Sequence, residues 1–187
     1  MDNLYISQSL TFESDKITID GFGYEIMMDW EHPIMSASAA YVTEGGGDIL
    51  EIGFGMGISA GYIQSHSIDS HIIVENHPQI IPKAVEWASG KSNVTIVSQS
   101  WYDVKDSIGT FDGIFYDTWG DNNYSDFSSS LSILTKSGTK VTWWHKYQNN
   151  KSNVHSIQNV TYKPINVSPP KNTYFNSTTY YLPMKEF

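Results

Sequence analysis

The feature that most constrains this chain is a glycine-rich turn between an apolar segment and a helical one. Gly53, Gly55 and Gly57 follow the mostly apolar segment 49–52, and Glu75 ends the next apolar run, 22 residues after Gly53. In a strand, turn, helix and strand unit of this kind, glycines let a nucleotide approach the backbone and the acid holds ribose hydroxyls. The pattern therefore predicts an α/β fold that binds a nucleoside-containing ligand.

Length and composition are those of a chain with its own hydrophobic core. A chain of 187 residues buries roughly 70% of the surface that its unfolded form exposes. Cysteine is absent, which excludes disulfides and thiolate metal sites. The sequence contains neither a basic and apolar leader nor the run of about 18 apolar residues that a spanning helix needs. We expect a cytoplasmic protein with one domain over residues 1–187, in which residues 1–45 form a flap and helix and residues 46–187 form the core.

The charge is unevenly distributed along the chain. The net charge is −9, and residues 1–51 carry ten acids but only one base, Lys16. An acidic segment of this kind would repel nucleic acids and membranes and attract a cationic ligand, although a solvated acidic surface explains it equally well. All eleven basic residues are lysines, so the chain lacks the planar fork with which arginine grips carboxylates and phosphates.

Hydrophobic periodicity predicts alternating strands and helices after an N-terminal flap. Two short strands at 16–20 and 24–28 form a hairpin, and a helix starts near Pro33. The alternation of the following elements is typical of a doubly wound, mostly parallel sheet, and a final antiparallel pair covers 160–167 and 174–182. The other predicted strands are 49–52, 71–75, 94–97, 111–116 and 140–143, and the predicted helices are 57–66, 78–88 and 124–134.

The glycine turn is compatible with more than one cofactor. A phosphate-binding loop needs a lysine and a hydroxyl residue after its last glycine, and Ile58 and Ser59 do not supply them. A dinucleotide remains possible, because residues 55–60 satisfy the relaxed glycine pattern. S-adenosylmethionine is favoured because some 45 residues precede the first core strand, whereas dinucleotide folds usually start near the N-terminus.

Aromatic and acidic residues follow the predicted strands where a ligand would lie. Asp117 and Trp119 follow strand 111–116, at the carboxyl edge where such sheets bind ligands. Trp101 and Tyr102 follow the third strand and could contact adenine. Ordinary core packing is the alternative for these aromatics, and a solvent-facing strand end is the alternative for Glu75.

Five ordered motifs carry a resemblance to a known family. They are MMDWEHPIM at 27–35, EIGFGMG at 51–57, HIIVENHP at 71–78, WYDV at 101–104 and FDGIFYDT at 111–118. Together they resemble guanidinoacetate N-methyltransferases and, more closely, the catalytic domain of fungal arginine δ-N-methyltransferases, including the closing residues 180–183. The resemblance extends from about Phe12 to the end of the chain. It implies a Rossmann-like class I methyltransferase fold with a mostly parallel seven-stranded sheet, an antiparallel C-terminal strand and an N-terminal flap.

The same resemblance implies the residues of a site. Glu31 and Asp117 would be catalytic and would hold the guanidino group, with Trp119 also contacting the substrate. S-adenosylmethionine, leaving as S-adenosylhomocysteine, would contact Tyr5, Met27, Met35, Gly53, Gly55, Met56, Gly57, Ile58, Ser59, Glu75, Asn76, His77, Trp101, Tyr102 and Asp117. The fungal enzymes carry ankyrin-type repeats that the printed sequence does not contain, so their protein substrate does not transfer directly.

The predicted chemistry explains why two acids are needed. A guanidinium has a pKa above about 12, so its nitrogens are poor nucleophiles at neutral pH. We expect Glu31 and Asp117 to orient it, and one of them to accept a proton as the new C–N bond forms. Alternatively, Glu31 only starts a helix, Asp117 only caps a strand, and His32 or His145 is the base.

These observations predict an S-adenosylmethionine-dependent methyltransferase acting on arginine, either free or in a peptide. Guanidinoacetate is the alternative substrate, a non-catalytic binding module and a nicotinamide-dependent oxidoreductase are alternative functions, and a homodimer is possible. The six histidines lack an HExxH-type spacing and the acids lack a calcium-loop pattern, so we expect no metal.

Overall fold

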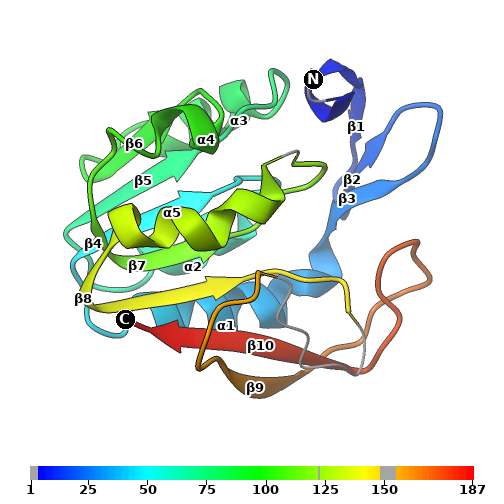
Figure 1. Cartoon of the computed structure of the whole chain (residues 1–187). Helices are drawn as coiled ribbons and strands as arrows, with labels where there is room; N and C mark the ends of the chain where they lie inside the picture. The colour runs from blue at the N-terminus through cyan, green and yellow to red at the C-terminus, as the bar shows by residue number, and fades with distance from the viewer. Residues whose placement is uncertain (1–3, 122, 148–154) are drawn as a thin grey trace.

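The computed structural model describes residues 4–121, 123–147 and 155–187. Its centre is a seven-stranded sheet of order β6-β5-β4-β7-β8-β10-β9 (Figure 1). Strands β4 to β8 pair in parallel, and β10 pairs antiparallel with both β8 and β9. This confirms the predicted α/β class and the mostly parallel sheet with an antiparallel C-terminal strand. The strands are β4 (Asp48–Ile52), β5 (Ser70–Val74), β6 (Val94–Val97), β7 (Phe111–Tyr116), β8 (Thr135–Trp143), β9 (Thr161–Asn166) and β10 (Thr179–Glu186).

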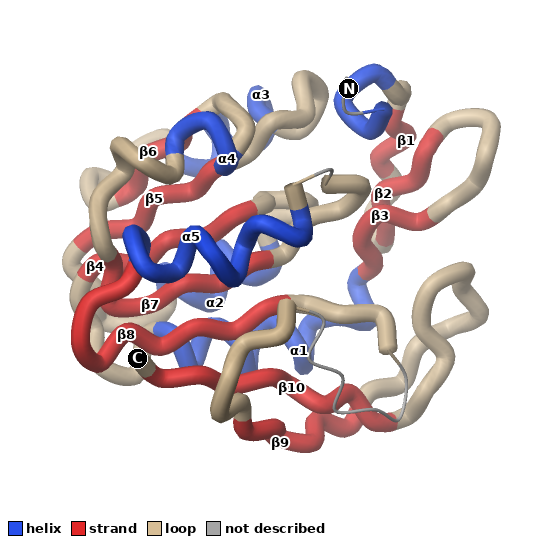
Figure 2. Tube along the Cα trace, in the orientation of Figure 1, coloured by secondary structure: helices blue, strands red, loops and turns tan. Residues whose placement is uncertain are grey.

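Helices cover both faces of the sheet (Figure 2). Side chains of a strand alternate between the two faces, so Ile49 packs with Met35 and Ile63 while Leu50 packs with Phe127 and Leu131. The helices on the Ile49 face are α1 (His32–Val42), α2 (Ile58–Gln64) and α3 (Ile81–Ala88), and those on the Leu50 face are α4 (Trp101–Val104) and α5 (Phe127–Leu134). Both faces of the central strands are therefore buried, as in other parallel sheets.

The strand order reverses beside β4. The chain passes from β4 to β5 and β6 on one side and then crosses to β7 on the other. Ligands of open α/β sheets bind at such a switch point, outside the carboxyl ends of the strands. The glycine turn follows β4 and Asp117 follows β7, so the fold places both at this point.

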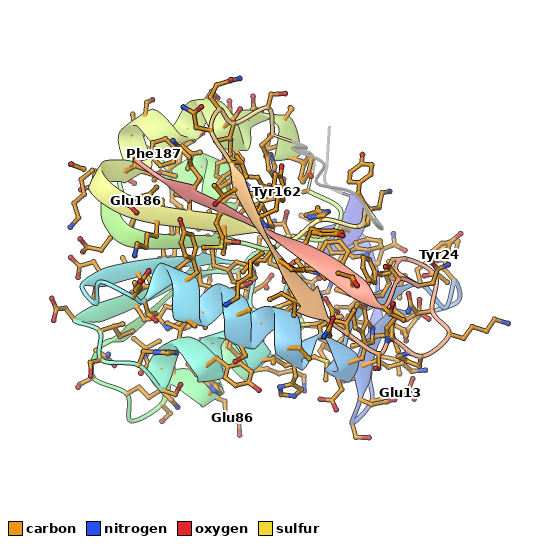
Figure 3. All side chains as sticks on the ribbon, turned by 90° about the horizontal axis from the view of Figure 1, so that it is seen from below. Glu13, Tyr24, Glu86, Tyr162, Glu186 and Phe187 are labelled. Atoms are coloured by element: carbon orange, nitrogen blue, oxygen red, sulfur yellow. The ribbon has the colours of Figure 1, made fainter. Side chains whose placement is uncertain are left out.

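The flap is a three-stranded antiparallel sheet that lies across the carboxyl ends of the central strands (Figure 1). It consists of β1 (Leu10–Phe12), β2 (Lys16–Ile19) and β3 (Glu25–Met28), and a short 3-10 helix, η1 (Leu4–Ser7), precedes it. The prediction of a two-stranded hairpin missed β1, because three residues are too few to show an alternating pattern. Figure 3 shows Tyr24 of the flap at the opposite end of the molecule from Phe187.

The last strand lies further along the chain than the sequence predicts. The sequence predicts a strand over residues 174–182, but β10 runs from Thr179 to Glu186. The Oδ1 atom of Asn172 accepts hydrogen bonds from the backbone N–H groups of Tyr174 (3.0 Å) and Phe175 (2.7 Å), which holds that segment in a turn. Pro183 does not end the strand: it lies opposite Tyr162 in the ladder to β9, and it lies outside the ladder to β8, which uses Lys185 and Glu186.

Other boundaries move by a few residues. The helix predicted from 78 begins at Ile81, and the strand predicted from 140 begins at Thr135. The helix predicted from 124 opens with the 3-10 turn η3 (Tyr124–Asp126). Helix ends are the least certain feature of a sequence pattern, because they depend on caps and packing rather than on periodicity.

Within the described ranges, no helix combines the length and the apolar character needed to cross a membrane. Nor do the described His, Asp and Glu side chains form a group of three or more that could hold a metal ion.

An aromatic cage around His155 makes stability depend on pH. The imidazole lies 4.4 Å from the ring of Tyr124, 5.0 Å from Phe127 and 5.6 Å from Trp143, measured between centroids. Burial lowers the pKa of His155 to about 4 from an ordinary 6.5. Its folded-state pKa lies below its unfolded one, so stability is lost as the pH falls from about 6.5 to about 4.

We therefore predict that His155→Phe reduces the acid sensitivity of the fold. Between pH 7 and pH 4, the wild-type free energy of unfolding should fall by about 3 kcal/mol more than that of the variant. Urea titrations at a series of pH values measure this difference, and His66→Gln, at an exposed histidine, is the control. Parallel pH profiles for wild type and His155→Phe would contradict the prediction.

Candidate active site

Two adjoining cavities open at the carboxyl ends of β4 and β7. The turn cavity lies between the glycine turn, the end of β5 and the flap. The outer cavity, about 550 Å³, lies between the flap, the end of β8 and the loop that contains Tyr174. Met27, Asp117 and Trp119 line both cavities. A ligand in one cavity would therefore lie next to a ligand in the other.

The glycine turn packs directly against β7 and the flap. Gly53 has a φ angle of +95°, and a Cβ atom there would overlap the carbonyl oxygen of Asp117. Gly55 has a φ angle of +53°, and its Cβ atom would lie 2.6 Å from the sulfur of Met27. Only glycine fits both the conformation and the space. The turn thus presents bare backbone to the cavity, as the sequence predicts for a nucleoside site.

Glu75 closes the inner end of the turn cavity. Its Oε2 atom accepts a hydrogen bond from the backbone N–H of Phe54 (3.0 Å), and its Oε1 atom accepts from Asn76 and His77 (2.8 Å each). Three backbone donors hold the carboxylate at the end of β5. This is the position from which an acid can reach ribose hydroxyls.

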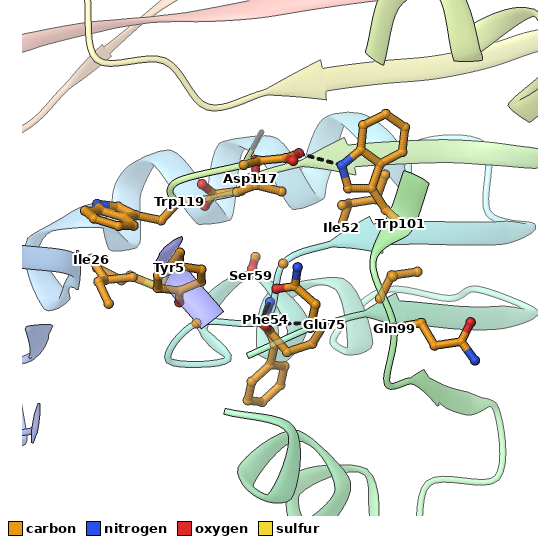
Figure 4. Close-up of a pocket in the computed structure, with 17 residues that line it drawn as sticks. Tyr5, Ile26, Ile52, Phe54, Ser59, Glu75, Gln99, Trp101, Asp117 and Trp119 are labelled. Atoms are coloured by element: carbon orange, nitrogen blue, oxygen red, sulfur yellow. Dashed lines mark hydrogen bonds between the residues drawn. The ribbon is translucent and has the colours of Figure 1, made fainter. Parts of the chain in front are cut away.

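Aromatic rings from distant parts of the chain form the walls of the turn cavity (Figure 4). The ring of Tyr5, from η1, lies 5.2 Å from that of Trp119. Burial, together with the charges of Glu75 and Asp117, raises the pKa of Tyr5, which keeps the phenol neutral. On the other side, the indole N–H of Trp101 donates to Asp121 Oδ2 (2.5 Å).

Nine of the residues expected to contact the cofactor line the turn cavity. They are Tyr5, Met27, Gly53, Gly55, Ser59, Glu75, Asn76, Trp101 and Asp117.

The other six expected residues lie outside its lining. Met35 is fully buried on α1, and Ile58 packs in the same cluster, to which Met56 contributes from its edge. Gly57 is the left-handed residue before α2. His77 lies behind Tyr5, with ring centroids 4.7 Å apart, and Tyr102 is 38% exposed on the outside of Trp101. These side chains support the cavity from behind or face away from it.

Glu31 lies in the wall of the outer cavity although it is 3% exposed. It belongs to η2 (Asp29–Glu31), the 3-10 turn that leads from the flap into α1. Its Oε1 atom accepts hydrogen bonds from the backbone N–H of Met28 (2.9 Å) and the hydroxyl of Tyr174 (2.7 Å). Burial raises the pKa of Glu31 to about 7, against the effect of these hydrogen bonds. Glu31 also immediately precedes α1, as the helix-start alternative expects, but its side chain does not cap the helix and is buried.

Asp117 lies where the two cavities meet. Its backbone N–H donates to the carbonyl of Ile52 (2.9 Å), which fixes it beside the glycine turn. Burial, and then the charges of Glu31, Glu51 and Glu75, raise the pKa of Asp117 well above its ordinary value. An opposite charge between two acids that share a cavity would favour the ionised form of both.

The two histidines considered as alternative bases occupy different environments. His32 is exposed and contacts Asp29 and Tyr62, and it lines neither cavity. His145 lines the outer cavity, where its Nε2–H donates to the carbonyl of Tyr181 (2.9 Å). Burial lowers the pKa of His145, which favours the neutral ring.

Several residues of the outer cavity were not found from the sequence. Tyr174 comes from the loop before β10, and Trp144 and Lys146 follow β8. Only Asn172, a turn residue ahead of two aromatics, gave a local signal that this loop does not continue a strand. The contact between Tyr174 and Glu31 joins residues 143 positions apart, which no local pattern predicts.

The sequence comparisons with known proteins match N-methyltransferases. The sequence profile described as "Guanidinoacetate N-methyltransferase" matches residues 5–141. Protein arginine N-methyltransferase 2 from Aspergillus oryzae is 37% identical over 135 residues, covering 68% of this chain and 32% of that protein. The Saccharomyces cerevisiae protein of the same name is 31% identical over 142 residues, covering 70% and 34%. The chain spans about a third of the length of these relatives.

Solved structures agree on the fold. Spermidine synthase from Thermotoga maritima aligns with a TM-score of 0.66 and 11% identity, covering 95% of this chain and 72% of that one. Precorrin-6y C5,15-methyltransferase from Geobacter metallireducens aligns with a TM-score of 0.63 and 11% identity, covering 90% and 91%. At this identity the likeness shows the Rossmann-like fold alone.

Loss of the Tyr174 hydroxyl should raise the pKa of Glu31. Tyr174→Phe removes a donor that stabilises the charged carboxylate, and a hydrogen bond to a charged group is worth about 1.5–3 kcal/mol, so the pKa should rise by about one or two. NMR titration of the glutamate side-chain carboxyl carbons measures it. Tyr162→Phe, on β9 and outside both cavities, should leave the Glu31 titration unchanged, and an equal effect of both variants would contradict the assignment.

Gly53→Ala should destabilise the fold strongly, because the new methyl group meets backbone atoms at a positive φ angle. We expect a loss of at least about 2 kcal/mol in the free energy of unfolding. Gly61→Ala is the matched control: it lies in α2 with nothing within 4 Å of the new Cβ atom, and should gain about 0.5–1 kcal/mol. Similar urea midpoints for the two variants would show that the turn is not tightly packed.

Proposed function

Because the chain belongs to the guanidinoacetate N-methyltransferase family, we propose that it transfers a methyl group from S-adenosylmethionine to a guanidino nitrogen of arginine, either free or in a peptide. One observation carries the proposal. Glu31 and Asp117 line one cavity, and Asp117 also lines the glycine-walled cavity beside it. A guanidinium bound between the acids would lie next to a nucleoside cofactor.

The turn cavity fits S-adenosylmethionine by its chemistry. Gly53 and Gly55 line it with backbone that carries no side chain, and Glu75 is positioned for the ribose. Tyr5 and Trp101 would contact the adenosine from two sides. When bound, S-adenosylmethionine supplies an electrophilic methyl group on a sulfonium sulfur, and S-adenosylhomocysteine is the product.

Glu31 and Asp117 orient the acceptor. A guanidinium presents five N–H donors in one plane, and carboxylates from the flap and from the end of β7 can bind different edges of it. The hydrogen bonds from Met28 and Tyr174 hold Glu31 in place before the substrate binds. Such positioning turns an encounter between two molecules into a reaction within one complex.

The acids also provide a destination for a proton. Guanidinium and methylguanidinium are both cations, so one proton leaves for each methyl group gained. Paired carboxylates stabilise the cation and oppose its early deprotonation, so the proton moves as the C–N bond forms and the nitrogen becomes acidic. Asp117, whose pKa is raised by burial and by neighbouring acids, is the acceptor that we favour, and Glu31 is the alternative.

Guanidinoacetate is the second candidate substrate, because the matching family profile carries its name. Its carboxylate requires a cationic or N–H partner in the outer cavity. A binding module without turnover is disfavoured, since buried acids are expensive to maintain where no cation uses them.

Asp117→Asn tests the assignment. We expect turnover to fall by roughly 10²-fold or more while cofactor affinity is retained, because the amide cannot accept the proton. Transfer of labelled methyl groups to arginine, guanidinoacetate and an arginine peptide measures turnover, fragmentation locates the methyl group, and calorimetry measures cofactor binding. Asp106→Asn, at an exposed acid, is the control, and near-normal turnover in Asp117→Asn would refute the role.

A further inference from the structure

The wall of the outer cavity contains an acid beyond the Glu31 and Asp117 pair. The register between β2 and β3 shifts so that Ile17 pairs with Met27 and Thr18 with Glu25, leaving Ile26 unpaired as a β-bulge. Glu25, Ile26 and Met27 all line the cavity as a result, where a regular strand would turn the middle residue away. The bulge therefore brings Ile26 into the wall between Met27 and Glu25, and the Glu25 residue lies on the acceptor side of the site.

Glu25 is held in place and ionised. Its Oε2 atom accepts hydrogen bonds from the hydroxyl and the backbone N–H (3.1 Å) of Thr173, which comes from the loop before β10. Partial burial acts to raise its pKa, but the hydrogen bonds from Thr173, a backbone hydrogen bond at Glu25 itself and the charge of Lys16 together lower the pKa of Glu25. A fixed negative charge at this position suits an ammonium group.

A positive charge lines the same cavity. Lys146, three residues beyond the end of β8, is the lysine among the residues that form the wall. In the part of the chain that the structure describes, it forms no ion pair with an acid, whereas Lys16, Lys105, Lys136 and Lys140 each do. Its ammonium group is therefore available to a carboxylate.

The spacing along β3 matches one arginine side chain. Glu25 lies two residues from Met27, and the bulge at Ile26 keeps their separation along the strand below the about 7 Å that two regular residues span. Met27 lies where the two cavities meet. The five bonds from Cα to Cζ of an extended arginine span roughly 6 Å, because each bond of about 1.5 Å advances the zigzag chain by roughly 1.25 Å. A guanidinium at the junction would place its α-carbon near Glu25.

We propose that Glu25 binds the α-ammonium group and Lys146 the α-carboxylate of free L-arginine, so that this site selects the amino acid over an arginine within a polypeptide. The inference rests on the proposed guanidino methyl transfer and names its substrate. Peptide bonds replace both charges in a polypeptide, which leaves Glu25 and Lys146 without partners. Guanidinoacetate has no ammonium group, and its carboxylate lies much closer to the guanidine.

Four acceptors separate the two contacts. L-arginine carries both charges, agmatine keeps the amine and lacks the carboxylate, Nα-acetyl-L-arginine keeps the carboxylate and lacks the ammonium, and Nα-acetyl-L-arginine N-methylamide lacks both. We expect wild-type kcat/KM to be highest for L-arginine and lowest for the doubly capped compound. Each lost charge-assisted contact should reduce it by about 10- to 100-fold.

The variants should show a crossed pattern. Glu25→Gln should lower kcat/KM by about 10-fold or more for L-arginine and agmatine and leave Nα-acetyl-L-arginine unchanged. Lys146→Met should do the reverse, affecting L-arginine and Nα-acetyl-L-arginine but not agmatine. Glu13→Gln and Lys163→Met, at exposed residues outside both cavities, are the matched controls.

The outcomes distinguish the two proposals. If none of the four acceptors is methylated, and neither guanidinoacetate nor an arginine peptide is methylated, guanidino methyl transfer itself is refuted. Efficient methylation of the doubly capped compound, or equal losses on all acceptors in both variants, would overturn the selection of free arginine while guanidino transfer stands. Cofactor affinity and thermal unfolding of each variant, compared with wild type, exclude a loss that comes from misfolding.

Discussion

The site depends on keeping two carboxylates, Glu31 and Asp117, in one largely buried cavity. A charge removed from water is costly unless partners replace its hydration. Glu31 obtains partners from Met28 and Tyr174, while Asp117 experiences the fields of Glu31, Glu51 and Glu75. Burial raises both pKa values, that of Glu31 against the effect of its hydrogen bonds and that of Asp117 together with the charges of its neighbours. A planar cation bound between them would relieve the repulsion between the two carboxylates, which is why we propose a guanidinium as the acceptor.

The glycine turn and Asp117 are packed and hydrogen-bonded to each other. Gly53 packs against the carbonyl of Asp117, and the N–H of Asp117 donates to Ile52, the residue before Gly53. Displacement of the turn would therefore move the acid, and displacement of the acid would move the turn. The closeness of β4 and β7 at the switch point thus fixes the relative positions of the two cavities.

Local sequence patterns predicted the elements that carry the turn, Glu75 and Asp117, because each lies at the end of a strand with strong hydrophobic periodicity. They missed β1, shifted β10 and gave no role to Tyr174, because these features depend on contacts between distant segments. Met35 shows the limit of a motif. It belongs to a motif that resembles the family's, but the structure places its side chain in the hydrophobic core, in one cluster with Ile49 and Ile58. Motifs identify which residues gather near a site, and packing decides which of them line it.

The uneven charge of the sequence acquires a spatial meaning in the fold. Glu25 and Glu31 from the acidic N-terminal segment line the outer cavity. Glu51 is fully buried below the turn. Its Oε1 atom accepts a hydrogen bond from the Ser59 hydroxyl, and its Oε2 atom lies 2.9 Å from Nε2 of His71. Salt screens exposed charges beyond about 10 Å and screens buried charges less. The acids in and below the two cavities therefore contribute more to the electrostatic potential there than the acids on the solvated surface do. Lys146 comes from the part of the chain in which acids and bases balance, and it places a positive charge in the wall of the outer cavity. The wall of this cavity therefore contains both negative and positive side chains.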